Sequence, residues 1–105
     1  MKKIKEQIEA IVNVYKSGNF SKAELLTKKL INNNPKVVFL YNLLGLILVE
    51  QKKIDEAIEC YEKGITIDPS FGMIFNNLGL LHLEHQASPD IKVVEKFYKK
   101  AISLD

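Results

Sequence analysis

The side chains best spaced for metal or acid–base chemistry are those of His82, Glu84 and His85, which fall within one short stretch. If that stretch is helical, the two histidines lie three residues apart on one face. A zinc or related site needs at least one more protein ligand than this pair provides. We therefore expect no metal here: His82 should pack between two helices, and His85 should lie near an exposed turn.

The remaining candidates for catalysis are one cysteine and a set of spaced glutamates. Cys60 has no partner for an internal disulfide, and no histidine shares its helical face to activate a thiolate. The glutamates recur at three-residue spacing, which is typical of a solvated helix face; they are Glu6, Glu9, Glu56, Glu59 and Glu62. The chain also lacks a glycine-rich phosphate loop and a nucleophile elbow. We expect no catalytic residue, no metal and no cofactor, and hence a protein that is not an enzyme.

Composition argues against several other classes of protein. The 105 residues carry a net charge of +2, which is too small to indicate binding to nucleic acid or to an anionic membrane. Every basic residue is a lysine, whereas planar recognition of phosphate usually uses arginine. The longest apolar run, residues 37–49, is too short to span a bilayer. With one cysteine and no signal-peptide pattern, the sequence predicts a cytoplasmic location.

Apolar residues recur every three or four positions along most of the chain, which predicts amphipathic helices. Breaks at Ser17–Asn19 and Asn32–Pro35 separate the first three of them. The later helices are expected at about 36–51, 54–67, 70–85 and 89–104. The stretch Ser88-Pro89-Asp90 predicts the start of the last helix, with Ser88 as the N-cap.

The chain also repeats itself at a spacing of 34 residues, because Pro35 aligns with Pro69 and Ala23 aligns with Ala57. At the same shift, Tyr41-Asn42-Leu43-Leu44-Gly45-Leu46 aligns with Phe75-Asn76-Asn77-Leu78-Gly79-Leu80. Extended matches at one period are the signature of a stacked repeat architecture.

These repeats resemble the tetratricopeptide repeat, whose pattern is W-x2-L-G-x2-Y, then A-x3-F, then P. The middle repeat reads Tyr41-x2-Leu44-Gly45-x2-Leu48, then Ala57-x3-Tyr61, then Pro69. The third reads Phe75-x2-Leu78-Gly79-x2-His82 and then, three residues late, Val94-x3-Tyr98. In the first repeat, the family's aromatic, Leu, Gly and Tyr positions hold Gln7, Ala10, Ile11 and Val14.

The resemblance covers essentially the whole chain and implies an all-α fold. It implies three stacked antiparallel helix–turn–helix repeats that form a right-handed α-solenoid fragment. The expected organisation is a single domain over residues 1–105, with repeats at about 4–37, 38–71 and 72–105 and an enlarged turn near 84–90. In such a hairpin, Gly45 and Gly79 leave room where the helices approach, and Ala57 lies opposite.

The resemblance further implies that the first helix of each repeat lines a concave groove. The expected peptide-binding positions are mostly apolar and include three amides; they are Ile8, Val12, Phe39, Asn42, Leu46, Val49, Met73, Asn76, Asn77, Leu80 and Leu83. The family's carboxylate clamp is absent, because its positions hold Ile8, Val12, Leu43, Met73 and Asn77. Asn77 alone matches the asparagine ladder by which one family member holds peptide backbones.

An apolar groove of this kind indicates an interaction site. We therefore expect a protein–protein interaction scaffold that binds an apolar or amphipathic peptide segment, with Asn42 and Asn76 pairing with the ligand backbone. The expected anchors are Phe39, Leu46, Met73 and Leu80. The competing account is that these side chains are buried against one another.

Two other functions stay open at this point. The chain could be the N-terminal module that positions substrate for a larger glycosyltransferase or sulfotransferase, or it could be a self-assembly module. The last helix carries more apolar surface than one neighbouring helix covers, which predicts weak homo-oligomerisation through Ile91, Val94, Phe97, Tyr98, Ala101 and Ile102.

Overall fold

The computed structural model describes residues 3–85 and 89–104. Within these residues the chain forms six helices and no strands, so the predicted all-α fold is confirmed. The helices are α1 (Ile4–Lys16), α2 (Phe20–Asn33), α3 (Val38–Glu50), α4 (Ile54–Ile67), α5 (Gly72–His85) and α6 (Ile91–Ser103).

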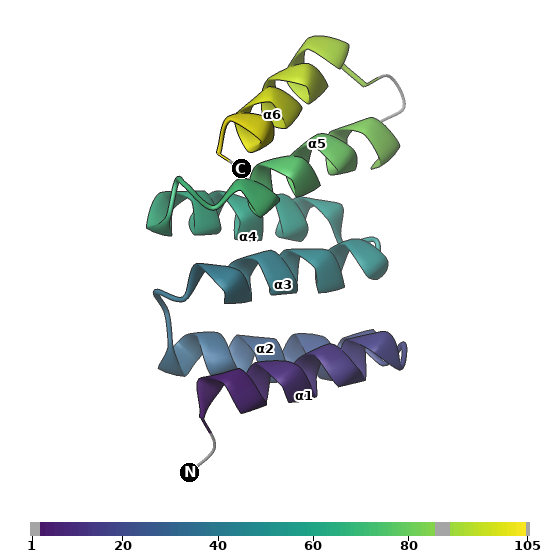
Figure 1. Cartoon of the computed structure of the whole chain (residues 1–105). Coiled ribbons are helices and arrows are strands. Elements are labelled where there is room, and N and C mark those ends of the chain that lie inside the picture. Colours follow the sequence, from purple (N-terminus) through teal and green to yellow (C-terminus); the bar gives the residue numbers. More distant parts are fainter. Residues whose placement is uncertain (1–2, 86–88, 105) are drawn as a thin grey trace.

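The six helices pack as consecutive antiparallel pairs, α1 with α2, α3 with α4 and α5 with α6 (Figure 1). Helices α2 and α4 each also contact the first helix of the following pair. The stack is elongated, with principal extents of 46 × 26 × 19 Å, and the first and last pairs lie at its opposite ends (Figure 1). This arrangement is a helical solenoid fragment, as the sequence predicts.

The turns inside the first two pairs end their helices in the same way. After α1, the N–H groups of Gly18 and Asn19 donate to the carbonyls of Tyr15 and Val14, and Gly18 has φ of +87°. After α3, Lys52 and Lys53 donate to Val49 and Leu48 in the same pattern, and Lys52 has φ of +63°. A left-handed residue at this position satisfies the last carbonyls of a helix, and glycine adopts it at the lowest cost.

The start of α6 differs from the sequence prediction. The N-cap is Asp90, whose carboxylate accepts a hydrogen bond from the Lys92 N–H at 3.0 Å. Ser88, the predicted N-cap, lies outside the described residues. The enlarged turn predicted near 84–90 includes residues 86–88 and therefore also falls partly outside them. The repeat boundaries themselves stay predictions.

The core consists of two buried clusters that correspond to the junctions of the stack. The N-terminal cluster joins α1, α2 and α3 and contains Ile11, Ala23, Leu30, Leu40, Leu43 and Ile47. The central cluster joins α3, α4 and α5 and contains Leu44, Leu48, Ala57, Tyr61, Ile74, Leu78 and Leu81. Helix α3 is buried on most of its sides, and its sequence is apolar apart from residues such as Asn42 and Glu50, as expected for a helix between neighbours.

Close approach within a pair occurs where the glycines predict it. A Cβ atom on Gly45 would overlap the aromatic ring of Tyr61, and one on Gly79 would lie 3.1 Å from the ring of Tyr98. Tyr61 is almost fully buried, and this burial raises the pKa of its hydroxyl. Glycine at these two positions therefore makes room for a tyrosine from the second helix of the same pair.

An ionic cluster around Glu24 ties α2 to the turn after α3. The Glu24 carboxylate accepts hydrogen bonds from Lys28 Nζ at 2.6 Å, from Gln51 Nε2 at 2.7 Å and from Lys53 Nζ at 3.0 Å. These donors, Lys28 foremost, lower the pKa of Glu24 from 4.5 to about 2. The first two pairs are thus held in register by polar contacts as well as by the apolar core.

Candidate functional site on the inner helices

The most exposed part of the predicted groove lies on α3 and α5. Four large apolar side chains on these two helices are open to solvent: Phe39, Met73, Leu80 and Leu83. Met73 retains 55% of its full exposure and Leu80 retains 41%, so neither belongs to the core. Met73, Leu80 and Leu83 recur at helical spacing along α5, and Phe39 of α3 lies at the position equivalent to Met73 one repeat earlier; these four side chains are called the apolar strip.

A small hollow adjoins this strip at Leu80. Its lining combines Leu46 and Val49 of α3 with Asn77 and Leu80 of α5, and its volume is about 40 Å³. Glu84 and His85 also line it, close to the end of α5. Four of the predicted groove residues therefore converge here, in a space of the size that holds a water molecule or one small ligand group.

The predicted role of Asn42 is wrong. Its side chain is 1% exposed, and its Oδ1 accepts a hydrogen bond of 2.7 Å from Asn77 Nδ2. Asn42 is buried because α5 covers the face of α3 that carries it, so its amide pairs inside the protein and is not open to a ligand backbone. Asn76, the equivalent residue of the next repeat, is exposed.

Ile8 and Val12 lie apart from the exposed predicted groove residues Phe39, Met73, Asn76, Leu80 and Leu83. Both side chains are half-buried and pack against the N-terminal cluster of Ile11, Leu40 and Leu43. The competing account, in which groove residues are buried against each other, therefore describes the first pair better than an open groove does. The structure brings together the predicted positions of α3 and α5 and does not join Ile8 and Val12 to them.

The sequence did not predict a larger hollow at the C-terminal end of the stack. This hollow has a volume of about 430 Å³ and lies between the first half of α5 and the last turn of α6. It is lined by Ser70, Phe71, Gly72, Met73, Asn76, Asn77, Ala101, Ile102 and Leu104. The signal that would have found it is Gly72 and Ala101, two small residues that face one another across the pair.

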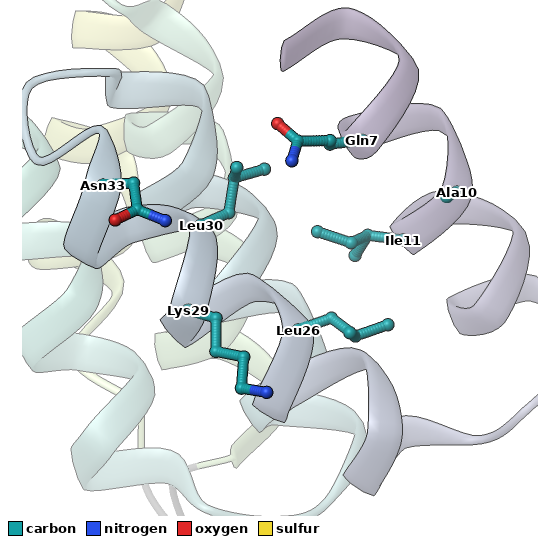
Figure 2. Close-up of a pocket in the computed structure, with 7 residues that line it drawn as sticks. All are labelled: Gln7, Ala10, Ile11, Leu26, Lys29, Leu30 and Asn33. Carbon is teal, nitrogen blue, oxygen red and sulfur yellow. The ribbon is translucent and has the colours of Figure 1, made fainter. Parts of the chain in front are cut away.

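A third hollow opens between α1 and α2, as Figure 2 shows. It has a volume of about 360 Å³, and its walls are mainly apolar. Gln7, Ala10 and Ile11 line it from α1, and Leu26, Lys29, Leu30 and Asn33 line it from α2 (Figure 2). Gln7 and Ala10 occupy the positions at which the middle pair carries the larger Tyr41 and Leu44, and the smaller side chains leave the space open.

The reactive side chains lie in structural settings. His82 stacks on the ring of Phe97, with ring centroids 5.4 Å apart, which confirms that it packs between α5 and α6. Burial raises the pKa of the Cys60 thiol and so disfavours the reactive thiolate. In residues 3–85 and 89–104, no three His, Cys, Asp or Glu side chains gather to hold a metal ion. None of the helices described there is long and apolar enough to cross a membrane.

Comparison with known proteins agrees with the repeat pattern and the paired helices. The model of the TPR repeat family matches residues 45–86, from the middle of α3 to the end of α5. This match supports assignment of the chain to the tetratricopeptide repeat family. A solved structure of the MamA RS-1 ArsTM double mutant superposes with a TM-score of 0.80 and 19% sequence identity. It covers 93% of this chain and 53% of that one, and at this identity it shows the fold alone.

A curated relative is the uncharacterized protein ycf37 of Pyropia yezoensis, which is 32% identical over 76 residues. The match covers 72% of this chain and 41% of the relative, so this chain spans about two fifths of that protein's length. Tetratricopeptide repeats support a general role as a protein-interaction scaffold, and such scaffolds are typically not enzymes.

Proposed function

We propose that the apolar strip on α3 and α5 binds an apolar or amphipathic segment of a partner protein. The observation that carries the proposal is the exposure of Phe39, Met73, Leu80 and Leu83 on the neighbouring helices α3 and α5. Contiguous exposed apolar surface of this kind is uncommon on a protein that has no partner, since water contact is unfavourable for it. Met73 adds an adaptable side chain that suits ligands of different shapes.

Asn77 contributes a polar side-chain amide beside this apolar strip. Its Nδ2 donates to Asn42, and the residue lines the hollow that it shares with Leu46 and Leu80. The hydrogen bond to the buried Asn42 restrains the Asn77 amide, and we propose its side-chain oxygen as the acceptor between the apolar anchors. The expected ligand therefore has apolar side chains on one face and at least one hydrogen-bond donor among them. We expect binding in the cytoplasm, where a single free cysteine is compatible with the reducing environment.

The test compares exposed apolar residues on and off the strip. Peptides selected from a displayed random library against the whole chain serve as probes. Met73→Ser with Leu80→Ser should weaken their binding by at least about tenfold, because anchor residues usually contribute more than 1 kcal/mol each. Leu25→Ser is the matched control, because Leu25 is equally exposed but lies on α2. A large loss of thermal stability in the double variant, or equal loss of binding in the control, would refute the proposal.

Weak self-association is a second candidate, favoured by two exposed side chains on α6. Ile91 and Ile102 keep 54% and 74% of their full exposure. We expect this contact only at high concentration, and Ile102→Asp should abolish any concentration-dependent increase of sedimentation coefficient. The transferase-module alternative stays a prediction from the sequence.

A further inference from the structure

The junction between the second and third pairs shows in atomic detail how this fold holds an added helix. Ile74 of α5 is fully buried, and its Cδ1 occupies the space beside Gly64. Tyr41 and Val38 form the other walls of that space. Three residues after Ile74, Asn77 donates its hydrogen bond to Asn42 at 2.7 Å. One turn further, Leu81 is buried in the central cluster.

We call the surface of the second pair that receives α5 the helix seat. The third pair carries an equivalent seat, and no helix in the described residues covers it there. Shifting the repeat places Gly72 at the position of Val38, Phe75 at Tyr41 and Asn76 at Asn42. With the three-residue delay that also aligns Tyr98 with Tyr61, Ala101 takes the position of Gly64. The hollow of about 430 Å³ lies at this place, and Gly72, Asn76 and Ala101 all line it.

We propose that this C-terminal seat, defined by Gly72, Asn76, Ala101, Ile102 and Leu104, binds an amphipathic α-helix of a partner protein. The docked helix places an aliphatic residue beside Ala101, as Ile74 lies beside Gly64. Three residues later it carries an amide that bonds to Asn76, as Asn77 bonds to Asn42. Seven residues after the first aliphatic residue, a second one takes the part of Leu81. The internal junction thus specifies the partner's sequence chemistry.

Continuity with the internal junction also argues against a second copy of this chain as the occupant. A copy stacked end to end would bring its α1 to the seat. At the positions of Ile74, Asn77 and Leu81, α1 carries Glu6, Glu9 and Asn13, all exposed. Placing the Glu6 carboxylate beside Ala101 would remove it from water without a partner, which is strongly unfavourable. At these three positions the upstream end is polar, so it does not match the seat at the downstream end.

Met73 and Asn77 border both this seat and the strip on α3 and α5, but Ala101 and Asn76 border the seat without lining the hollow of the strip, so variants there let the two proposals fail separately. The probe is a labelled synthetic helix with Ile, Asn and Leu at positions i, i+3 and i+7. It also carries Leu at i+4, the counterpart of Leu78, and only Ala, Glu and Lys elsewhere. Fluorescence anisotropy with the whole chain should show saturable binding. Ala101→Leu should weaken it by at least about tenfold, since the added side chain fills the seat.

The amide pair provides a second test with a matched control. Asn76→Leu should weaken binding of the Asn-containing helix by about tenfold, because one amide would be buried without a partner. A helix with Leu in place of its Asn should bind Asn76→Leu better than it binds the unchanged protein. Such coupling between the two positions is the sign of a direct contact. Asn13→Leu, an exposed amide on α1, should change neither affinity.

Three outcomes would overturn the proposal. One is equal binding of the helix to the unchanged chain, Ala101→Leu and Asn76→Leu, with all three showing native melting curves. Another is loss of binding in Met73→Ser/Leu80→Ser but not in Ala101→Leu, which would assign the helix to the strip. The third is a dimer at micromolar concentration that Ala101→Leu dissociates, since the seat would then hold a second copy.

Discussion

The first and middle helix pairs both place a large side chain against a small one where their two helices approach, but the large side chain comes from the first helix in one pair and from the second helix in the other. In the middle pair, Gly45 on the first helix faces the large Tyr61 on the second. At the equivalent positions of the first pair lie Ile11 and Thr27, both buried. Thr27 Oγ1 donates to the Ala23 carbonyl at 2.7 Å, so its hydroxyl is satisfied within its own helix. The hairpin needs one large and one small side chain, and either helix can supply the large one.

The two pairs also differ in how completely the space between their helices is filled and in the residues at the junction with the next pair. Tyr41 and Leu44 fill space in the middle pair that Gln7 and Ala10 leave as a hollow in the first. In the middle pair, the residue equivalent to Glu24 is Ile58, which packs against the central cluster at the next junction along the stack. The first pair is therefore less completely filled between its own helices than the middle pair, and its junction with the next pair is more polar at the edge.

The largest expected effect is at Gly45. Gly45→Leu should lower the free energy of unfolding by about 3 kcal/mol, because the new side chain collides with the buried ring of Tyr61. Urea denaturation monitored by circular dichroism measures the change. An unchanged midpoint would refute the close contact between the two helices.

A swap variant sharpens the same comparison. Gly45→Ile with Tyr61→Thr gives the middle pair the residues of the first. If bulk can move between helices, this double variant should be more stable than the sum of its two single changes predicts. Additive losses would show that the first pair depends on something beyond this exchange.

The ionic edge of the first junction should respond to pH. Because the pKa of Glu24 falls from 4.5 to about 2 on folding, its carboxylate stabilises the protein above pH 4.5. That contribution is lost as the pH falls toward 2. Glu24→Gln should therefore cost about 1–2 kcal/mol near neutral pH, and this cost should shrink steadily below pH 4.5 and vanish below the folded-state pKa of about 2. Glu6→Gln, an exposed carboxylate, is the control, and a pH-independent cost at Glu24 would contradict the prediction.

Filling the first-pair hollow should stabilise the protein. Ala10→Leu restores the residue that the middle pair has at Leu44 and should add about 0.5–1 kcal/mol to the unfolding free energy. The thermal midpoint measures the gain. Destabilisation would show that the side chain cannot enter the space between α1 and α2 that Figure 2 displays.

The smallest expected effect concerns the turns. Lys52 has a left-handed backbone at the position where the first pair has Gly18. Lys52→Gly should therefore raise stability by about 0.5 kcal/mol, whereas Gly18→Lys should lower it by a similar amount. Chemical denaturation of both variants checks this, and changes of the same sign in both would contradict it.

Much of this molecule is predictable from local pattern. Apolar periodicity places the helices, and Gly45 and Gly79 mark the close contacts, because only a missing side chain admits a tyrosine there. The packing of His82 between α5 and α6 also follows from the repeat pattern, whereas the choice of Phe97 as its neighbour comes from the structure. The N-cap of α6 was missed because Ser, Pro and Asp all suit the first residues of a helix, and the choice among them depends on the path of the preceding turn.

Asn42 and Asn76 show the limit of such reasoning. They lie 34 residues apart in matching segments, and by sequence alone they are equivalent groove amides. Tertiary structure separates them, since α5 covers Asn42 and supplies Asn77 as its partner, while in the described residues no helix covers Asn76. A repeat fixes which side chains a helix offers. Whether those side chains become core or surface depends on what the stack places against them, and residue spacing does not encode that neighbour.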